Sequence, residues 1–478
     1  MNTIRTVAKN TSALVGGEAV SRVLTFLVTL YIARSLGAES LGQYAFALAF
    51  VSLFRVFADM GLNTLTTREV AKDHKMAGKY LTNLLTIKSL LGFLTFLLVY
   101  LAVHATGKSE ELSLLVYVAA LWIWAESLGG LVQSVFSGFE SMEYVALLNV
   151  VEKAVLFGVS FYALLSDVPH KLLWLISAYP ISSLCAFFVG IILLAVRGLP
   201  VRMEVDRKFW MDVLRAGWPF ALMGILGGIY LYTDRVLLSI IQGEDRVVGW
   251  YTAGAKAFWT VYAVQAFFYR ALFPTASKTY SESTEDYIRM LKRTGRFIFT
   301  YTIPVATVGI VWAPKVVDFF YGHNYVPTVL VLQILLINLV IKGWTGLYGS
   351  TVLNVTGRQK DFMCAVGLGA LVNVVLNILL IPLLSLNGVA VATVCAEATV
   401  GFVAYLRARK VVELSVAQYI WRPALASGAM AALWLYGRGV IWTASGFVAF
   451  LALLWLTRCV RRQDISFLSA SLGLRRAA

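Results

Sequence analysis

Residues 11–65 read TSALVGGEAVSRVLTFLVTLYIARSLGAESLGQYAFALAFVSLFRVFADMGLNTL. Two apolar runs, 11–34 and 41–65, stand on either side of a short polar stretch. Each run has the roughly twenty residues that a helix needs to cross a hydrocarbon core of about 30 Å. The stretch therefore predicts a membrane-embedded helical hairpin.

The same pattern continues along the chain. Hydrophobic residues make up 59% of the 478 residues and charged residues only 14%, whereas soluble chains have roughly 45–50% and about 25%. We expect spans at 11–34, 41–65, 80–102, 112–137, 144–166, 172–196, 213–242, 247–273, 295–313, 328–353, 362–383, 387–406, 419–437 and 440–457. Because a helix satisfies its own backbone groups in lipid, the predicted fold class is an all-α integral membrane protein with about fourteen transmembrane helices.

The formal charge of +15 comes from Lys and Arg residues that stand mostly in short loops between the apolar runs. With the N-terminus in the cytoplasm, 27 of the loop residues fall on the cytoplasmic side and 6 on the other. Cytoplasmic loops carry such an excess. The distribution predicts a multi-pass protein of the cell (plasma or inner) membrane with both termini in the cytoplasm. No basic surface with interleaved aromatic residues stands outside the spans, which excludes a nucleic-acid partner.

An internal repeat divides the chain. Residues 13–16 (ALVG) match 221–224 (ALMG), and 42–44 (GQY) match 249–251 (GWY). Six spans separate the copies, so both have the same orientation, and an axis along the membrane normal should relate two pseudo-symmetric six-helix lobes. The predicted domains are an N-lobe over 1–200, a C-lobe over 201–411, and two additional helices with a basic cytoplasmic tail over 412–478.

Fourteen ionisable residues remain inside the expected spans. A charge at the bilayer centre costs at least about 2.5–3.5 kcal/mol, so each must face a bundle interior, a wet cavity or an opposite charge. The candidates for a substrate-binding cavity are Arg22, Arg55, Lys88, Lys153, Asp234, Arg235, Lys256 and Lys342. The candidates for ion coupling are Glu18, Asp59, Glu126 and Glu397.

These charges have two interpretations. An acid and a base four residues apart, such as Asp59 and Arg55, share a helical face and can form a structural pair. The four lysines have no acid at helical spacing except Glu152 beside Lys153, which points about 100° away around the helix. They need partners from other helices, water or a ligand. An anionic ligand such as a phosphate supplies what a cation in a cavity lacks.

Aromatic residues accompany the charges. Trp259 and Tyr262 stand three residues apart and could stack on sugar rings, with Gln265 and Gln133 as hydrogen-bonding groups. Aromatic packing between helices gives the same pattern. Both interpretations remain open at the level of sequence.

Catalytic features are missing from the sequence. All four histidines fall in loops, no glycine-rich phosphate loop of the nucleotide-hydrolase type occurs, and the longest loops have about twenty residues. We therefore expect a transporter without cofactor or metal, driven by an ion gradient, the substrate gradient or downstream consumption. A polytopic glycosyltransferase or ligase would need a sizeable outer loop with catalytic carboxylates or histidines, and a passive scaffold or scramblase stays an alternative.

Particular stretches carry a family resemblance. They are GGEAVSRVLTFLVTLYIARSLGAESLGQYAFALAF at 16–50, FADMGLNTLTTREVA at 57–71, YTDRVLLSIIQGEDRVVGWYTAGAK at 232–256, LNVTGRQK at 353–360 and NVVLNILLIPLLSLNGVAVATVCAE at 373–397. In order and spacing they resemble the polysaccharide transporter and O-antigen flippase branch of the multidrug/oligosaccharidyl-lipid/polysaccharide exporter superfamily.

The resemblance implies a two-lobed transporter with a central cationic cavity, lined or braced by Arg22, Arg55, Asp234, Arg235 and Lys256. The expected function is a flippase. It would carry a polyprenyl-(pyro)phosphate-linked oligosaccharide from the cytoplasmic to the outer leaflet by alternating access, for cell-surface polysaccharide or glycan biosynthesis. Polysaccharide polymerase or ligase machinery is a candidate partner. A lipid II flippase and a cation-coupled multidrug antiporter of the same superfamily are the alternatives.

Overall fold

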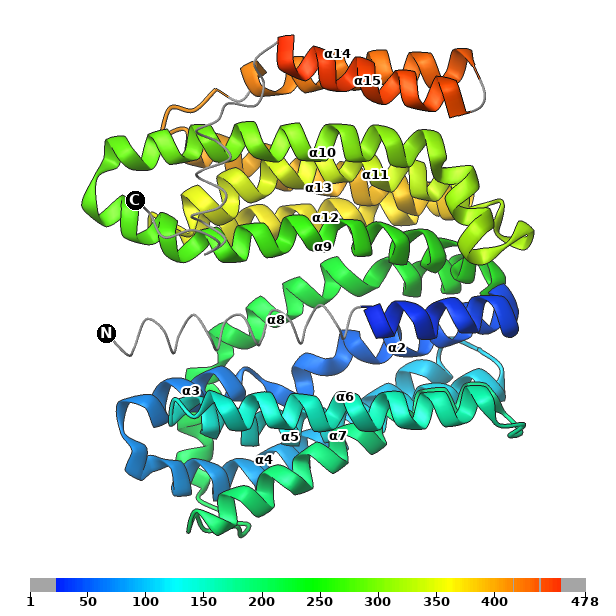
Figure 1. Ribbon diagram of the computed structural model, residues 1–478. Coiled ribbons are helices and arrows are strands. Elements are labelled where there is room, and N and C mark those ends of the chain that lie inside the picture. Colours follow the sequence, from blue (N-terminus) through cyan, green and yellow to red (C-terminus); the bar gives the residue numbers. More distant parts are fainter. Residues whose placement is uncertain (1–22, 416, 438–439, 457–478) are drawn as a thin grey trace. The chain divides into compact units, whose positions relative to one another are not determined.

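The computed structural model describes residues 23–415, 417–437 and 440–456. All regular structure in these residues is helical, which confirms the all-α fold class (Figure 1). Ten of the described helices are long and apolar enough to cross a membrane. The chain forms two compact units, unit 1 up to Gly249 and unit 2 from Trp250.

The helices follow the expected spans closely in number and order. Unit 1 holds a helical segment at Val23–Ser35, then α2 (Gly37–Asp59), α3 (Leu62–Lys72), α4 (Ala77–His104), α5 (Glu110–Gly138), α6 (Met142–Leu165), α7 (Lys171–Val196) and α8 (Arg207–Gln242). The helix α9 (Asp245–Glu282) begins in unit 1 and continues into unit 2. Unit 2 then holds α10 (Thr284–Tyr321), α11 (Thr328–Thr345), a π-helical segment (Gly346–Leu353), α12 (Gln359–Leu384), α13 (Leu386–Ala408), α14 (Ala417–Tyr436) and α15 (Val440–Leu456).

Two helices extend well beyond the apolar runs that predicted them. The spans expected at 247–273 and 295–313 lie within α9 and α10, which have 38 residues each. At 1.5 Å per residue each helix is about 57 Å long. Hydropathy marks only the part of a helix that lies in lipid, whereas capping sets its ends: the Ser283 hydroxyl accepts from the backbone N–H of Asp286 and starts α10.

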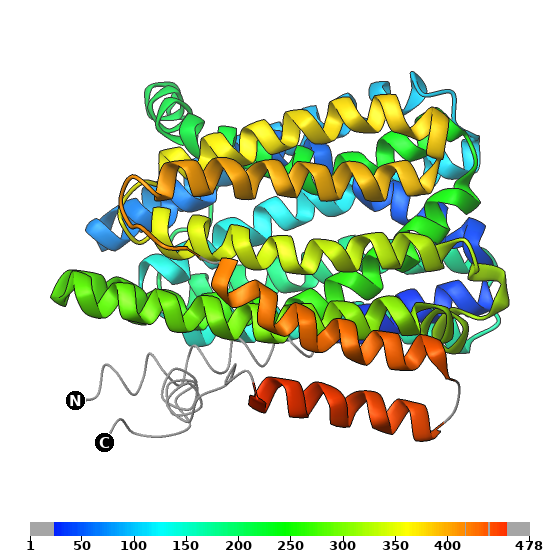
Figure 2. The same ribbon diagram turned by 90° about the horizontal axis from the view of Figure 1, so that it is seen from above.

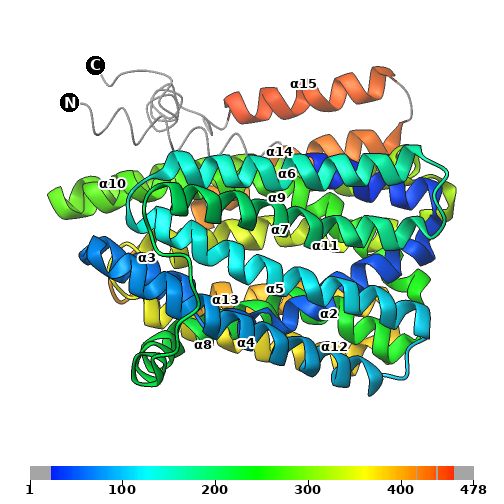
Figure 3. The same ribbon diagram turned by 90° about the horizontal axis from the view of Figure 1, so that it is seen from below.

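The helix α5 organises unit 1. It packs against α2, α3, α4, α6 and α7, and Figure 3 shows the axes of α4, α5, α6 and α7 roughly aligned. Its Leu131, Val135 and Phe136 are fully buried in the core. Because these apolar side chains hold α5 in place, its polar residues Glu126 and Ser127 lie among the surrounding helices.

A break interrupts the single helix that we expected at 41–65. Met60 and Gly61, between α2 and α3, have φ angles of 50° and 75°, a left-handed region that suits glycine. A Cβ atom on Gly61 would lie 2.6 Å from the carbonyl oxygen of Gly217, so the missing side chain also lets α8 approach. The helices α2 and α3 both pack against α5. The break therefore brings the end of one helix and the start of the next to the same neighbour.

In unit 2, buried tyrosine side chains form hydrogen bonds between elements that are distant in the sequence. The Tyr287 hydroxyl donates to the carbonyl oxygen of Thr351 at 2.5 Å, and the Tyr348 hydroxyl to that of Leu414 at 2.8 Å. The helix α14 packs against α10 and against α15, which follows it in the chain (Figure 2). The lobe boundaries at residues 200 and 411 stay a prediction. The helix α8, which follows residue 200 in the chain, packs against α2 and α3 and belongs to unit 1.

The repeated glycines Gly42 and Gly249 lie at one helix crossing within unit 1. A Cβ atom on Gly42 would lie 1.7 Å from the carbonyl oxygen of Asp245, and one on Gly249 would lie 1.8 Å from that of Ala38. Lys108 reinforces the crossing, because its ammonium group lies 3.8 Å from the carboxylate of Asp245. The two copies of the repeat therefore both use glycine for close backbone contact.

We expect the Gly42→Ala variant to lower the unfolding temperature of the purified protein, because α2 and α9 must separate to admit the methyl group. Overpacking of this kind costs about 1–3 kcal/mol. The matched control is Gly158→Ala in α6, where a Cβ atom would meet nothing within 4 Å and alanine favours the helix by roughly 0.5–1 kcal/mol. Equal melting temperatures for the two variants in detergent would contradict the close crossing.

Candidate functional site

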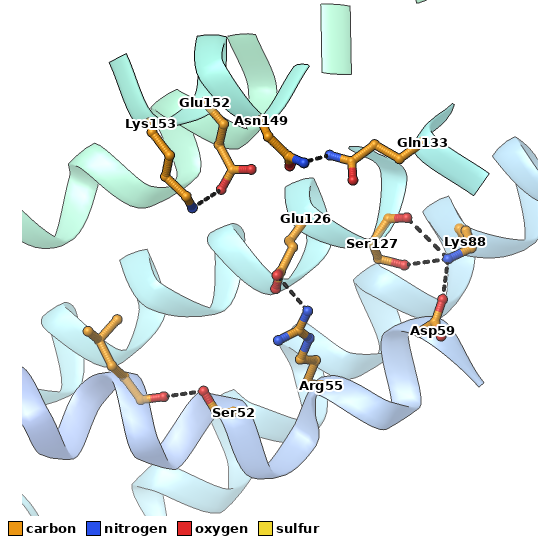
Figure 4. A network of polar contacts seen from close by, with 11 residues as sticks. Ser52, Arg55, Asp59, Lys88, Glu126, Ser127, Gln133, Asn149, Glu152 and Lys153 are labelled. Carbon is orange, nitrogen blue, oxygen red and sulfur yellow. Dashed lines mark hydrogen bonds and ion pairs between the residues drawn. The ribbon is translucent and has the colours of Figure 1, made fainter. Parts of the chain in front are cut away.

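An ion pair joins α2 to α5 in unit 1. The Arg55 guanidinium donates to Oε1 of Glu126 at 2.6 Å (Figure 4). The side chains are 49% and 26% exposed, so the pair lies at a cavity wall and not in packed core. Arg55 thus pairs with an acid on another helix, and not with Asp59 on its own helix as the spacing suggested.

A second pair, between Lys88 on α4 and Asp59 on α2, lies beside the first. The Lys88 side chain is 0% exposed, and its ammonium group lies 2.6 Å from the Asp59 carboxylate. It also donates to the carbonyl oxygen and the hydroxyl of Ser127, both at 3.1 Å. A lysine ammonium has three donors, and here all three have partners in the protein. The absence of an acid at helical spacing did not make Lys88 an unpaired cation: its acid comes from another helix.

Polar groups of α5 and α6 extend this network (Figure 4). Lys153 lies 3.2 Å from the carboxylate of Glu152, its neighbour in sequence. Gln133 on α5 donates to the amide oxygen of Asn149 on α6 at 3.4 Å, which is a long hydrogen bond. Neighbouring residues on a helix diverge by about 100°, but the long side chains of Lys153 and Glu152 still meet.

Two cavities share the wall formed by Arg55, Glu126 and Asn63. The first, of about 370 Å³, lies among α2, α3, α5 and α8 and includes Gly224 and Gly228 in its lining; we call it the glycine chamber. The second, of about 440 Å³, lies among α2, α3, α5, α6 and α7 and includes the amides of Asn63, Gln133 and Asn149; we call it the amide chamber.

Several polar atoms on the wall of the amide chamber are buried and have no hydrogen-bond partner in the protein. They are Oδ1 of Asn63, Oε2 of Glu126 and Oγ of Ser183. A buried polar group without a partner costs about 1–3 kcal/mol. The protein itself therefore leaves part of the hydrogen-bonding capacity of these three residues unused.

Unit 2 contains a buried ion pair of its own. The Lys342 ammonium group lies 2.6 Å from the Glu397 carboxylate, and the side chains are 9% and 4% exposed. The ammonium group also lies 5.4 Å from the ring centroid of Trp259 and 5.1 Å from that of Tyr262. The rings that we nominated for sugar stacking thus face a cation. Gln265, nominated with them, is buried, and neither of its amide atoms has a hydrogen-bond partner.

The other nominated residues are distributed over the chain. Arg22 and Glu18 lie outside the described residues. Asp234 and Arg235 lie on α8, where Asp234 is buried and Arg235 partly buried, and Lys256 lies half-buried on α9 in unit 2. Of the nominated cations in the described part of unit 1, Arg55 and Lys153 line the chambers.

Among the lining residues of the amide chamber that sequence reasoning missed are Asn63, Asn149 and Ser183. Two of them had a signal: Asn149 opens the motif NVV, which recurs at 373–375, and Asn63 follows the glycine at the helix break. Ser183 had none. Among the described residues, no group of three or more His, Cys, Asp or Glu side chains could hold a metal ion.

Known proteins resemble this chain over most of its length. A candidate O-antigen transporter of Shigella flexneri is 24% identical over 69% of this chain and 81% of its own. The lipid II flippase MurJ of Bacillus subtilis is 22% identical over 80% and 79%. The fold matches a solved structure of lipid II flippase MurJ in an inward closed conformation with a TM-score of 0.76 over 96% of this chain and 99% of that one, at 15% identity.

The family model described as polysaccharide biosynthesis protein matches residues 7–280, which is more than half of the chain and includes every residue of the two chambers. The chain therefore belongs to the polysaccharide biosynthesis protein family.

Proposed function

We propose that this protein is a flippase that carries a polyprenyl-(pyro)phosphate-linked oligosaccharide from the cytoplasmic to the outer leaflet by alternating access. Its place in the polysaccharide biosynthesis protein family and its similarity to an O-antigen transporter and a lipid II flippase support a transporter of lipid-linked saccharides and not an enzyme. Both termini would lie in the cytoplasm, in the plasma or inner membrane. Polysaccharide polymerase or ligase machinery would take up the product.

The Arg55–Glu126 pair is the observation that carries the proposal. A guanidinium group presents five N–H donors in a planar fork that matches phosphate oxygens. The Glu126 carboxylate contacts it through one oxygen, while its other oxygen has no partner. Arg55 is half-exposed at the wall that both chambers share. A substrate phosphate can therefore approach the same guanidinium from the chambers and compete with Glu126.

Charge balance explains how binding can be coupled to an ion. The network contains three cations and three acids: Arg55, Lys88 and Lys153 against Asp59, Glu126 and Glu152. An anionic substrate then adds uncompensated negative charge, unless an acid takes up a proton or another cation enters. Glu126 is the acid that would respond, because the substrate displaces it from Arg55. The other nominated cations, Arg22, Arg235 and Lys256, stay candidates for contact with an anionic substrate.

The proposal gives the remaining nominated residues different roles. Lys88 is a brace, since it is fully buried and lines neither chamber. Lys342 would have the same role in unit 2, where Glu397 and two aromatic rings surround it. Lys153 lines the amide chamber and stays a candidate for substrate contact.

A cation-coupled multidrug antiporter is less well supported by the acids. Such a protein needs carboxylates whose charge is not already neutralised by a basic side chain. Asp59, Glu126 and Glu397 each lie 2.6 Å from a basic side chain. A lipid II flippase remains the closer alternative, and the choice of glycan in a transport assay separates it from an oligosaccharide flippase.

We expect Arg55→Ala to abolish translocation while the protein still inserts and folds. The assay uses purified protein in liposomes and a fluorescent polyprenyl-pyrophosphate oligosaccharide, scored by protection from an impermeant modifying enzyme. The double variant Arg55→Ala with Glu126→Gln removes the acid that the single change leaves unpaired. If Arg55 binds the phosphate, the double variant stays inactive. Recovery of wild-type transport would show that Arg55 merely neutralises Glu126.

We expect Lys88→Met to lower stability, because it leaves the Asp59 carboxylate without its cation. Removing one partner of a buried pair costs about 3–5 kcal/mol, and the value here should fall below that range since Asp59 is 27% exposed. The double variant Lys88→Met with Asp59→Asn should regain most of the loss in a thermal unfolding measurement in detergent. A Lys88→Met protein with wild-type stability and no transport would instead make Lys88 a binding residue.

A further inference from the structure

The lining of the amide chamber is almost entirely polar. Besides its two glycines, Gly129 and Gly130, Ala186 is the only lining residue without a polar side chain. The glycine chamber, in contrast, includes Leu53, Phe220 and other apolar side chains. An apolar ligand would strip water from the amide chamber without replacing its hydrogen bonds. The chamber therefore suits a ligand that carries many hydroxyl or amide groups.

The hydrogen-bonding capacity of the chamber is not used up by the protein. Oδ1 of Asn63 can only accept, and the buried Ser183 hydroxyl can donate and accept, yet neither has a partner. The bond between Gln133 and Asn149 is long at 3.4 Å, so both amides can turn toward a ligand. Sugar hydroxyls both donate and accept hydrogen bonds, so they can pair with both the donors and the acceptors of the chamber wall.

The backbone of α5 is shaped to make this space. A Cβ atom on Gly130 would lie 2.4 Å from Nδ2 of Asn63, so glycine at this position lets the Asn63 amide reach the chamber wall. A Cβ atom on Gly129 would meet nothing closer than the Ser183 carbonyl oxygen at 3.9 Å. Gly129 therefore leaves open space where any other residue would project into it.

The charges of the chamber cancel. Arg55 and Lys153 face Glu126 and Glu152, each pair within 3.2 Å. A net neutral wall favours an uncharged sugar over a uronic acid or a sulfated sugar. The volume of about 440 Å³ lies in the range of small-molecule sites, about 300–1,000 Å³. It can hold the sugars nearest the phosphate and not a long glycan.

We propose that the amide chamber is a saccharide subsite, which binds the uncharged sugar units that follow the phosphate of the lipid-linked substrate. This inference rests on the proposed flippase function. Arg55 lines the amide chamber, so a phosphate bound to its guanidinium would have the polar wall of this chamber beside it.

The test compares two ligands in competition binding to the purified protein: a polyprenyl pyrophosphate that carries a neutral disaccharide, and the same polyprenyl pyrophosphate without sugar. The double variant Gln133→Met with Asn149→Leu replaces both amides by apolar groups of similar size. It should weaken binding of the sugar-bearing lipid about tenfold or more, because each lost hydrogen bond is worth roughly 0.5–1.5 kcal/mol. Binding of the sugarless lipid should stay within about twofold.

Two further variants control for the possibility that a substitution changes binding through misfolding. Thr95→Val in α4 removes a buried hydroxyl that bonds only within its own helix and lines neither chamber, so it should change neither affinity. Gly129→Ala adds a methyl group in the open space and favours the helix, so it should fold normally and still weaken the sugar-bearing lipid selectively.

The outcomes separate this inference from the proposed function. If the amide variant and Gly129→Ala weaken both lipids equally, or neither, the chamber is a structural or merely hydrated cavity and the inference fails. The flippase function still stands in that case, provided that the wild-type protein moves the sugar-bearing lipid in liposomes. A wild-type protein that binds and moves neither lipid would overturn the proposed function itself.

Discussion

The need to neutralise charge inside a membrane organises this structure. No bulk water is available in hydrocarbon, so each ionisable side chain must find an opposite charge, hydrogen bonds or a wet cavity. Here the opposite charges come from different helices: Arg55 with Glu126 joins α2 to α5, Lys88 with Asp59 joins α4 to α2, and Lys342 with Glu397 joins α11 to α13. The pairs thus act as cross-links that specify which helices meet and in which register.

The pairs differ in exposure, and that difference separates bracing from binding. Lys88 is fully buried and its donors all have partners, so it holds three backbone segments together. Arg55 is half-exposed at a wall between two chambers and shares its guanidinium with a single carboxylate oxygen. A brace must stay in place while a transporter changes conformation, whereas a binding group must exchange partners. The exposed pair is therefore the one suited to meet a substrate.

Glycine has a second organising role in unit 1. The break at Gly61 brings α2, α3 and α8 together, and Gly130 makes room for the Asn63 amide. The glycine chamber and the amide chamber both depend on such close approaches. Small residues commonly let membrane helices approach closely. In this protein the same property also creates space lined by polar groups.

The sequence by itself determined the membrane class, the all-helical fold and the order of the described helices, because hydropathy along one helix depends only on local composition. It also singled out the charged residues within the spans, among them Arg55 and Glu126, because a charge in lipid is costly wherever it points. Helix ends were predicted less well, as α9 and α10 continue through polar residues beyond the lipid-matching run.

Only the tertiary structure decided the partners. Spacing of four residues suggested that Arg55 pairs with Asp59, but each of these side chains reaches an opposite charge on another helix. A pair between helices depends on packing angle and register, which no local pattern contains. The amide chamber arose in the same way: Asn63, Gln133, Asn149 and Ser183 come from four helices, and their common wall exists only because α5 is buried among the others.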